Sequence, residues 1–231
     1  MLSKHAIWVL TFTFTFAVTG CAQVKSILSP PLPPEKLRAE TLKIVDLLKE
    51  KPDWLYASDS CPASVMTEVG NKPNFYKEGC SANPQKCLND CKNGDPTSCY
   101  ALALLIEEYV EPYSESPQPL YLRSCKLGIT SGCTNRAANI AELKPNDLVA
   151  QKCATDTFEK TCSQNDPWGC TMFGLALSRG DGRTKDVPAA VKALEKACEV
   201  SVDKNGSACK KSIELRELIK RTESLENKVN N

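Results

Sequence analysis

The residues with the most obvious chemistry in this chain of 231 amino acids are its 13 cysteines. A chain so rich in thiols either binds a metal ion or forms disulfides. Three pairs share a Cys-x7-Cys spacing and a fourth has three more intervening residues: Cys91/Cys99, Cys125/Cys133, Cys162/Cys170 and Cys198/Cys209. Zinc sites usually use Cys-x2-Cys or a similarly close spacing. The wider, repeated spacing favours four disulfides, and a thiolate metal site that includes Cys87, Cys91 and Cys99 is the alternative.

Few other residues could carry catalysis. The only histidine is His5, which lies in a leader segment described below, so the remaining chain has no histidine for a general base, a haem ligand or a Cys/His zinc site. Ser201/Lys204 and Ser207/Lys210 match a Ser-x-x-Lys pattern, but no Ser-Asp-Asn or Lys-Thr-Gly motif accompanies them. We therefore expect no catalytic residue, no bound metal ion and no cofactor.

The first 20 residues are typical of an export signal. Lys4 precedes an apolar run over residues 6–18, which is too short for a bilayer span of ~20 residues. Residues 18–21 resemble the bacterial lipobox, in which a terminal cysteine thiol receives a diacylglyceryl group. The sequence thus predicts lipidation of Cys21. A plain secretory signal cut near Ala17 or Gly20, with Cys21 unmodified, is the alternative.

A proline-rich stretch follows the lipobox. Residues 21–34, with four prolines, are predicted to form an extended tether after the lipidated cysteine. Ala22 and Gln23 follow Cys21, and neither is the aspartate that would keep a lipoprotein from being sorted to an outer membrane. The resemblance therefore favours sorting to an outer membrane. We expect an exported, lipid-anchored protein that faces the periplasm or the cell surface. Such a compartment is oxidising, and the 12 cysteines beyond Cys21 are an even number, as disulfides require.

The cysteines also mark a repeat. Cys91, Cys125, Cys162 and Cys198 lie 34, 37 and 36 residues apart, a period typical of two-helix repeats. Three positions after the first cysteine stand residues that tolerate a left-handed backbone, namely Gly94, Gly128 and Asn165. Helix-capping residues come next, namely Asp95, Asp166 and, in the second unit, Thr130. Each cysteine pair is therefore expected to flank the turn of one helical hairpin.

Two further positions of the repeat predict packing. The residue four positions before the first cysteine should face inward on the first helix: Cys87, Tyr121, Phe158 and Leu194. The residue four positions after the second cysteine is small in three of four units, which lets neighbouring helices approach closely: Ala103, Ala137, Gly174 and, as the exception, Ile213. Terminal repeats often depart from the pattern in this way.

These features resemble the Sel1-like repeat family. The best match covers residues 168–198, with Gly174, residues 180–182, Asp186 and the run that ends at Cys198. The added cysteine pairs are similar to those of the Helicobacter cysteine-rich proteins. The resemblance implies an all-α fold, a right-handed α/α solenoid of about four helix-turn-helix repeats over residues 84–222, with a concave binding face. Units one and two lack the Gly-x-Gly turn, and a disulfide-rich helical domain that is not a solenoid is the alternative.

The remaining segments are less regular. Residues 35–83 are expected to form an N-terminal helix and a turn-rich cap, in which residues 35–51 make an amphipathic helix with apolar positions Leu37, Leu42, Ile44, Val45, Leu47 and Leu48. Residues 223–231 should be a polar tail. Cys61, Cys80, Cys87 and Cys153 allow three pairings. A local bridge from Cys80 to Cys61 or Cys87 is plausible, a Cys87–Cys153 bridge is not expected, and free thiols remain an alternative.

The function indicated is binding. The 29 basic and 28 acidic residues give no basic footprint for nucleic acid. We expect a monomeric scaffold or adaptor for an unidentified protein or peptide, held at the membrane by its lipid. The resemblance also implies a penicillin-binding protein or weak β-lactamase as an alternative. Aromatic anchors for a partner, or else packing residues, are Trp54, Trp168, Tyr109, Tyr113 and Tyr121. We expect a structural role for Trp168, and solvation for Asp181 and Arg183 in an exposed turn.

Overall fold

The computed structural model describes residues 30–55, 60–71, 77–110 and 116–229, and within them the chain is helical. The leader, Cys21, most of the tether and Tyr113 lie outside these residues. The helices in order are α1 Pro34–Lys49, α2 Pro62–Val65, α3 Lys77–Ala82, α4 Pro84–Lys92, α5 Pro96–Tyr109, α6 Gln118–Lys126, α7 Thr130–Leu143, α8 Leu148–Ser163, α9 Pro167–Arg179, α10 Val187–Val200 and α11 Ser207–Val229.

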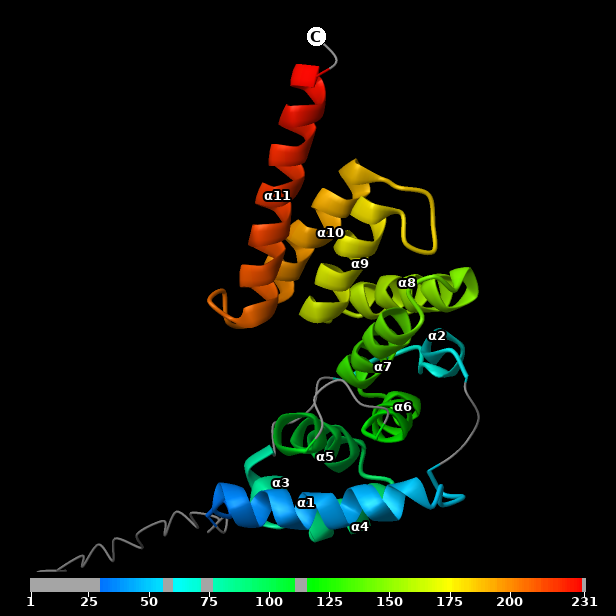
Figure 1. The fold of residues 1–231 in the computed structure, drawn as a ribbon, viewed down its shortest axis with the longest axis vertical. Coiled ribbons are helices and arrows are strands. Elements are labelled where there is room, and N and C mark those ends of the chain that lie inside the picture. Colours follow the sequence, from blue (N-terminus) through cyan, green and yellow to red (C-terminus); the bar gives the residue numbers. More distant parts are fainter. Residues whose placement is uncertain (1–29, 56–59, 72–76, 111–115, 230–231) are drawn as a thin grey trace, which may run out of the picture.

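The helices from α4 onward form four hairpins that follow one another along the molecule (Figure 1). The hairpins are α4/α5, α6/α7, α8/α9 and α10/α11, and each packs on the next one along the chain. Helices α1 and α3 lie against α4 and α5 at one end, whereas α11 lies at the other end beyond α10. The prediction of an all-α chain is therefore confirmed for the described residues.

The hairpin turns follow the local chemistry expected of them. Gly94 and Gly128 both adopt φ of 100°, and Asn165 adopts φ of 62°, in the left-handed region that these residues tolerate best. The Asp95 carboxylate accepts hydrogen bonds from two backbone N–H groups at the start of α5. Asp166 does the same for the N–H of Gly169 at the start of α9. Both caps satisfy donors that a helix start leaves unpaired.

The cap predicted at Thr130 is wrong. Helix α7 begins at Thr130 itself, its N-cap is Ile129, and no side chain caps it. The backbone N–H of Thr130 instead donates to the carbonyl oxygen of Asn71 at 3.2 Å, and the N–H of Asn71 donates to Gly128 at 2.8 Å. A distant segment thus supplies the acceptor that a capping side chain supplies in the other turns.

The inward and small positions of the repeat pack against each other across successive hairpins. Tyr121, Phe158 and Leu194 are at most 2 % exposed. Ala103 shares a core cluster with Tyr121, and Ala137 shares one with Phe158. A methyl group on Gly174 would lie 2.6 Å from Cγ of Leu194. In the first three hairpins the small residue of the second helix therefore packs against the large residue of the next first helix, a pairing that the spacing had not specified.

The N-terminal part differs from the expected cap. Helix α1 buries Leu37, Ile44, Val45 and Leu48 against the first hairpin, but Leu42 and Leu47 are exposed. Residues 60–71, including α2, do not stay with α1: they lie beside α6, α7 and α8 in the middle of the molecule (Figure 1). The cap predicted over residues 35–83 is thus two separate pieces.

The C-terminal part is longer and better connected than expected. Helix α11 continues to Val229, through much of the predicted polar tail. Arg183, predicted to be solvated, forms ion pairs with Asp156 and Glu159 of α8 and stacks on the ring of Phe173 at 5.6 Å. The loop between α9 and α10 is therefore fixed to the preceding hairpin.

Six disulfides occur among the described residues. Four close the hairpin turns, namely Cys91–Cys99, Cys125–Cys133, Cys162–Cys170 and Cys198–Cys209. Cys80–Cys87 joins α3 to α4. Cys61–Cys153 joins the start of the 60–71 segment to α8, across a sequence separation of 92 residues. The sequence left these last two pairings open, with Cys80–Cys87 as one of two plausible local bridges.

Candidate peptide-binding face

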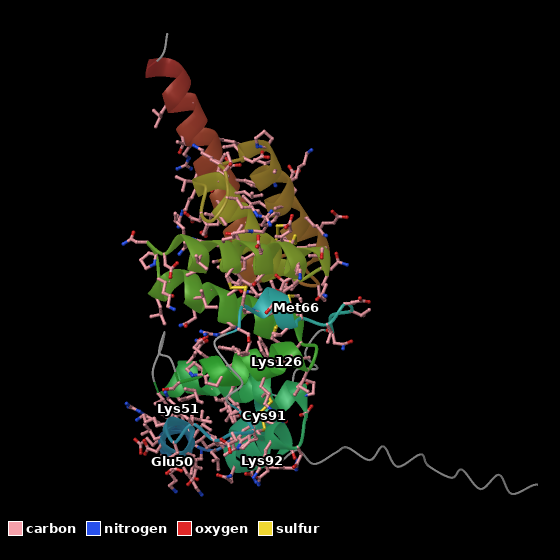
Figure 2. The ribbon with its side chains drawn as sticks, turned by 90° about the vertical axis from the view of Figure 1, so that its right-hand side faces the viewer. Glu50, Lys51, Met66, Cys91, Lys92 and Lys126 are labelled. Atoms are coloured by element: carbon pink, nitrogen blue, oxygen red, sulfur yellow. A yellow bond between two sulfur atoms is a disulfide. The ribbon has the colours of Figure 1, made fainter. Side chains whose placement is uncertain are left out.

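Residues 60–71, hereafter the 60–71 segment, run across one face of the hairpins. The residues that hold it through hydrogen bonds are Gly128, Thr130, Thr157, Lys160 and Gln164, which we call the docking face. Figure 2 looks onto this side of the molecule and shows Met66 of the segment together with Lys126 and Lys92, the last residues of α6 and α4. The docking face therefore lies where the hairpins make their turns.

The first half of the segment is held by α8. The backbone N–H of Ala63 donates to Oγ1 of Thr157 at 3.2 Å, and Nζ of Lys160 donates to the carbonyl oxygen of Ala63 at 2.6 Å. Cys61 is bonded to Cys153 on the same helix. Positions 153, 157, 160 and 164 follow a helical period, so these residues form one stripe along α8.

The second half is held by Gln164 and by the turn before α7. Nε2 of Gln164 donates to the carbonyl oxygens of Thr67 at 2.8 Å and Glu68 at 3.1 Å. Asn71 exchanges backbone hydrogen bonds with the turn, as described above, in a parallel bridge to Ile129. The docking face thus contacts mainly the main chain of its occupant, which forms one helical turn at Pro62–Val65 and is irregular beyond it.

Besides the disulfide of Cys61, a few side chains of the segment contribute. Pro62 is the one buried residue within the 60–71 segment, and Val65 and Met66 are partly buried. A Cβ atom on Gly70 would lie 2.0 Å from Oγ1 of Thr130 and 2.2 Å from Oε1 of Gln164, so a side chain there would have to displace both groups. Val69, by contrast, is 77 % exposed. The arrangement thus disfavours side-chain bulk at the position of Gly70.

A guanidinium group fixes the chain that leads toward this segment. Arg123 of α6 donates to the carbonyl oxygens of Cys91 and Lys92 at 3.0 Å each, and to that of Trp54 at 2.7 Å. The same group lies 5.2 Å from the ring centroid of Trp54. The guanidinium group of Arg123 thus donates to three carbonyl oxygens and also makes a cation–π contact with one ring. Trp54, a predicted partner anchor, is already engaged inside the molecule.

The tyrosine predicted as an anchor on α6 is also engaged. Tyr121 is fully buried and its hydroxyl donates to Oε2 of Glu107 at 2.8 Å. Its ring lies 5.8 Å from that of Tyr100, and burial raises the pKa of both phenols above their ordinary value. Burial also raises the pKa of the Glu107 carboxyl, with a smaller contribution from the charge of Glu142, while the bond from Tyr121 lowers it.

The remaining aromatic candidates divide between core and surface. Tyr109 packs at the edge of the core cluster around Leu37 and Leu105. Trp168, for which a structural role was expected, is 39 % exposed at the start of α9. Of the predicted anchors that the structure describes, Trp168 alone has an exposed side chain.

The first Ser-x-x-Lys pair is engaged in closing helix α10. The Ser201 hydroxyl donates to the carbonyl oxygen of Ala197 at 2.7 Å, while Nζ of Lys204 donates to those of Cys198 at 2.7 Å and Glu199 at 2.8 Å. Lysine at a helix C-terminus satisfies carbonyls that have no partner within the helix. Ser207 of the second pair is the first residue of α11.

The described residues contain neither a candidate metal site nor a candidate membrane-spanning helix. Within them, no group of three or more His, Cys, Asp or Glu side chains is placed to hold a metal ion. No helix in the same part of the chain combines the length and the apolar character that crossing a bilayer needs. The predicted lipidation site, Cys21, lies outside these residues.

The docking face was not identified from the sequence. Thr157, Lys160 and Gln164 are common residue types on a helix, and none carries a motif. Cys153 was the available signal, because a cysteine outside the hairpin pairs shows where a distant segment attaches. Once Cys61 is its partner, the stripe of positions one, two and three turns further along the chain from Cys153 follows from helical geometry.

Comparison with known proteins gives no match: no family model, no curated protein and no solved structure matches this chain.

Proposed function

We propose that this chain is an exported, lipid-anchored scaffold, an α/α solenoid of Sel1-like hairpins that binds a peptide segment of another protein. The observation that carries the proposal is the main-chain docking of the 60–71 segment by Lys160, Gln164 and the turn at Gly128. A surface that holds one segment through its backbone has the chemistry to hold others of the same backbone shape. The export signal, the residues around Cys21 and six disulfides support an oxidising compartment.

The anchor is tested by mass spectrometry of the protein isolated from membranes, with and without reduction. We expect a triacylated Cys21 and five short-range disulfides beside Cys61–Cys153. A free thiol at Cys21, or zinc retained by the hairpin cysteines, would refute the lipoprotein and disulfide parts of the proposal respectively.

Binding is tested in living cells by placing a photo-crosslinking amino acid at exposed positions of different hairpins. Suitable sites are Ser163, beside the docking face, and Leu148 and Lys192, which lie on α8 and α10. We expect a defined protein to crosslink at one or more of these sites and to be lost from the Cys21→Ala chain, which is released from the membrane. Absence of any crosslinked protein at all sites would contradict a scaffold function.

A further inference from the structure

We propose that the 60–71 segment is an internal occupant of a peptide-binding site, and that opening the Cys61–Cys153 disulfide lets a segment of a partner protein with the same backbone shape, one helical turn followed by an irregular stretch, replace it. The partner segment carries a proline near one end and a glycine at the position of Gly70. This inference rests on the proposed scaffold function and assigns its binding site, the docking face.

The Cys61–Cys153 bond differs from the other five in accessibility. Both Cys61 and Cys153 are partly exposed, whereas each of the other described disulfides has at least one fully buried member. Of the cysteines in those five bonds, Cys198 alone is partly exposed, and its partner Cys209 is 3 % exposed. A thiolate from solvent therefore reaches the Cys61–Cys153 bond first, because exchange requires access to a sulfur atom.

The bond also differs in what it connects. The other disulfides span 7 to 11 residues and join helices that remain neighbours along the chain. Cys61–Cys153 joins elements 92 residues apart and fastens the segment to α8. Opening it leaves all four hairpin turns closed and frees one end of the segment.

Only non-covalent contacts retain the segment once the bond opens. Pro62 is buried, while Val65 and Met66 are partly buried. The hydrogen bonds from Lys160 and Gln164 go to main-chain carbonyls, which another peptide with the same backbone shape also offers.

The chemistry of the site defines the class of ligand. A Cβ atom at position 70 would have to displace Oγ1 of Thr130 and the end of the Gln164 side chain, so the site favours glycine there. Pro62 occupies the buried position eight residues earlier. Positions 67–69 are exposed, so their side chains are not selected. The site thus favours a proline and a glycine eight residues apart.

The opening step is a thiol–disulfide exchange with the dithiol of an exported oxidoreductase. One reductase thiolate attacks Sγ of Cys61 or Cys153, so that a mixed disulfide forms and the chain's own S–S bond breaks, which releases the other cysteine as a thiolate that takes up a proton. The second reductase thiol then attacks the mixed disulfide. The chain gains two thiols, and the reductase dithiol is oxidised to its disulfide.

The test uses the full chain with Cys61→Ser, which leaves Cys153 as a thiol, combined with Gly70→Val, which displaces the internal segment through the contacts at Thr130 and Gln164. The probe is a synthetic peptide of residues 60–71 whose cysteine carries a thionitrobenzoate leaving group. Attack by the Cys153 thiolate links the peptide and releases the coloured thiol. Peptide mapping assigns the link to Cys153.

We expect capture at least about tenfold faster than for a scrambled peptide with its cysteine at the same position, a difference of about 1.4 kcal/mol in binding. A probe with valine at the position of Gly70 should react at the scrambled rate. Gln164→Ala in the chain should slow capture, whereas Ser163→Ala, its exposed neighbour, should not. Equal rates for matched and scrambled probes would overturn the proposal.

A second measurement on the wild-type chain applies even if the double variant does not fold. Graded reduction, followed by alkylation and mass spectrometry, should label Cys61 and Cys153 before any other pair, with faster amide exchange at Asn71. Earlier labelling of another pair would overturn the proposal. If the peptide is not captured but a partner crosslinks at Leu148 or Lys192 in cells, this inference fails and the scaffold function stands.

Discussion

Gly174 allows a close approach between the third and fourth hairpins, so we expect its replacement to be energetically coupled to a change at Leu194. A Cβ atom at position 174 would lie 2.6 Å from Cγ of Leu194 and 2.9 Å from the carbonyl oxygen of Ala190. Leu194 is fully buried and cannot turn into solvent. Overpacking of this kind lowers the unfolding free energy by ~1–3 kcal/mol. The better helix propensity of alanine raises it by ~1 kcal/mol. We expect Gly174→Ala to lose about 1 kcal/mol of unfolding free energy.

The coupling appears when Leu194 is shortened as well. Leu194→Ala alone leaves a cavity and should cost ~2–5 kcal/mol. In the double variant the new methyl group of position 174 enters that cavity, so its clash is largely removed and its helix propensity remains. We expect the double variant to be about as stable as Leu194→Ala, or slightly more stable, which is an interaction energy of about 1–2 kcal/mol relative to additivity.

Urea unfolding of the oxidised proteins, followed by circular dichroism, measures the four free energies of this cycle. Ala137→Gly provides the matched comparison, because Ala137 occupies the same position of the preceding hairpin beside Phe158 and already carries the methyl group. That change should cost ~1 kcal/mol from helix propensity alone. Additive effects of the Gly174 and Leu194 changes, within ~0.5 kcal/mol, would refute the close-approach reasoning.

Three further changes test other contacts. Burial raises the pKa of Glu107 in the folded chain, so the stability that this carboxyl contributes is present below its ordinary pKa and is lost as the pH rises through the folded pKa. In pH-dependent thermal melts Glu107→Gln should therefore stabilise the chain at neutral pH and lose that advantage in acid. The control Glu108→Gln should not show this pattern. Arg123→Lys keeps one bond to carbonyls in place of three and should cost ~1–3 kcal/mol by urea unfolding. Lys204→Ala should cost ~0.5–1 kcal/mol, and neither the chain nor this variant should hydrolyse the chromogenic β-lactam nitrocefin.

The features that the sequence predicted correctly are local ones. Gly94 and Asn165 close helices because a left-handed residue has the same role in any chain, and Asp95 caps α5 with a side chain two or three residues from its donors. The inward positions follow from helical period within single units. A sequence separation of eight residues between cysteines needs only one turn to bring them together, so such pairs can be predicted without knowledge of the rest of the fold.

The features that the sequence missed depend on contacts between distant residues. Thr130 looked like a cap, but its N–H found an acceptor on Asn71, 59 positions earlier. Arg183 looked solvated in a turn rich in glycine, but Asp156 and Glu159 lie beside it on another hairpin. The docking face needs the Cys61–Cys153 pairing, which four unassigned cysteines left open. No local pattern specifies which partner such residues meet.

The distribution of disulfides explains how one segment could be released while the hairpins stay folded. In the chain-entropy relation a hairpin bond with a separation of 8 residues stabilises by about 2.6 kcal/mol, whereas Cys61–Cys153, with a separation of 92, stabilises by about 4.6 kcal/mol. Both terms arise because the bond restricts the unfolded chain. Opening Cys61–Cys153 in the folded protein therefore does not release that free energy locally, since the hairpins on either side keep their own bonds and packing. The local change is limited to the contacts of the 60–71 segment, whose hydrogen bonds go mostly to its main chain. The bond that contributes most against complete unfolding is thus also one whose opening leaves the hairpin turns closed.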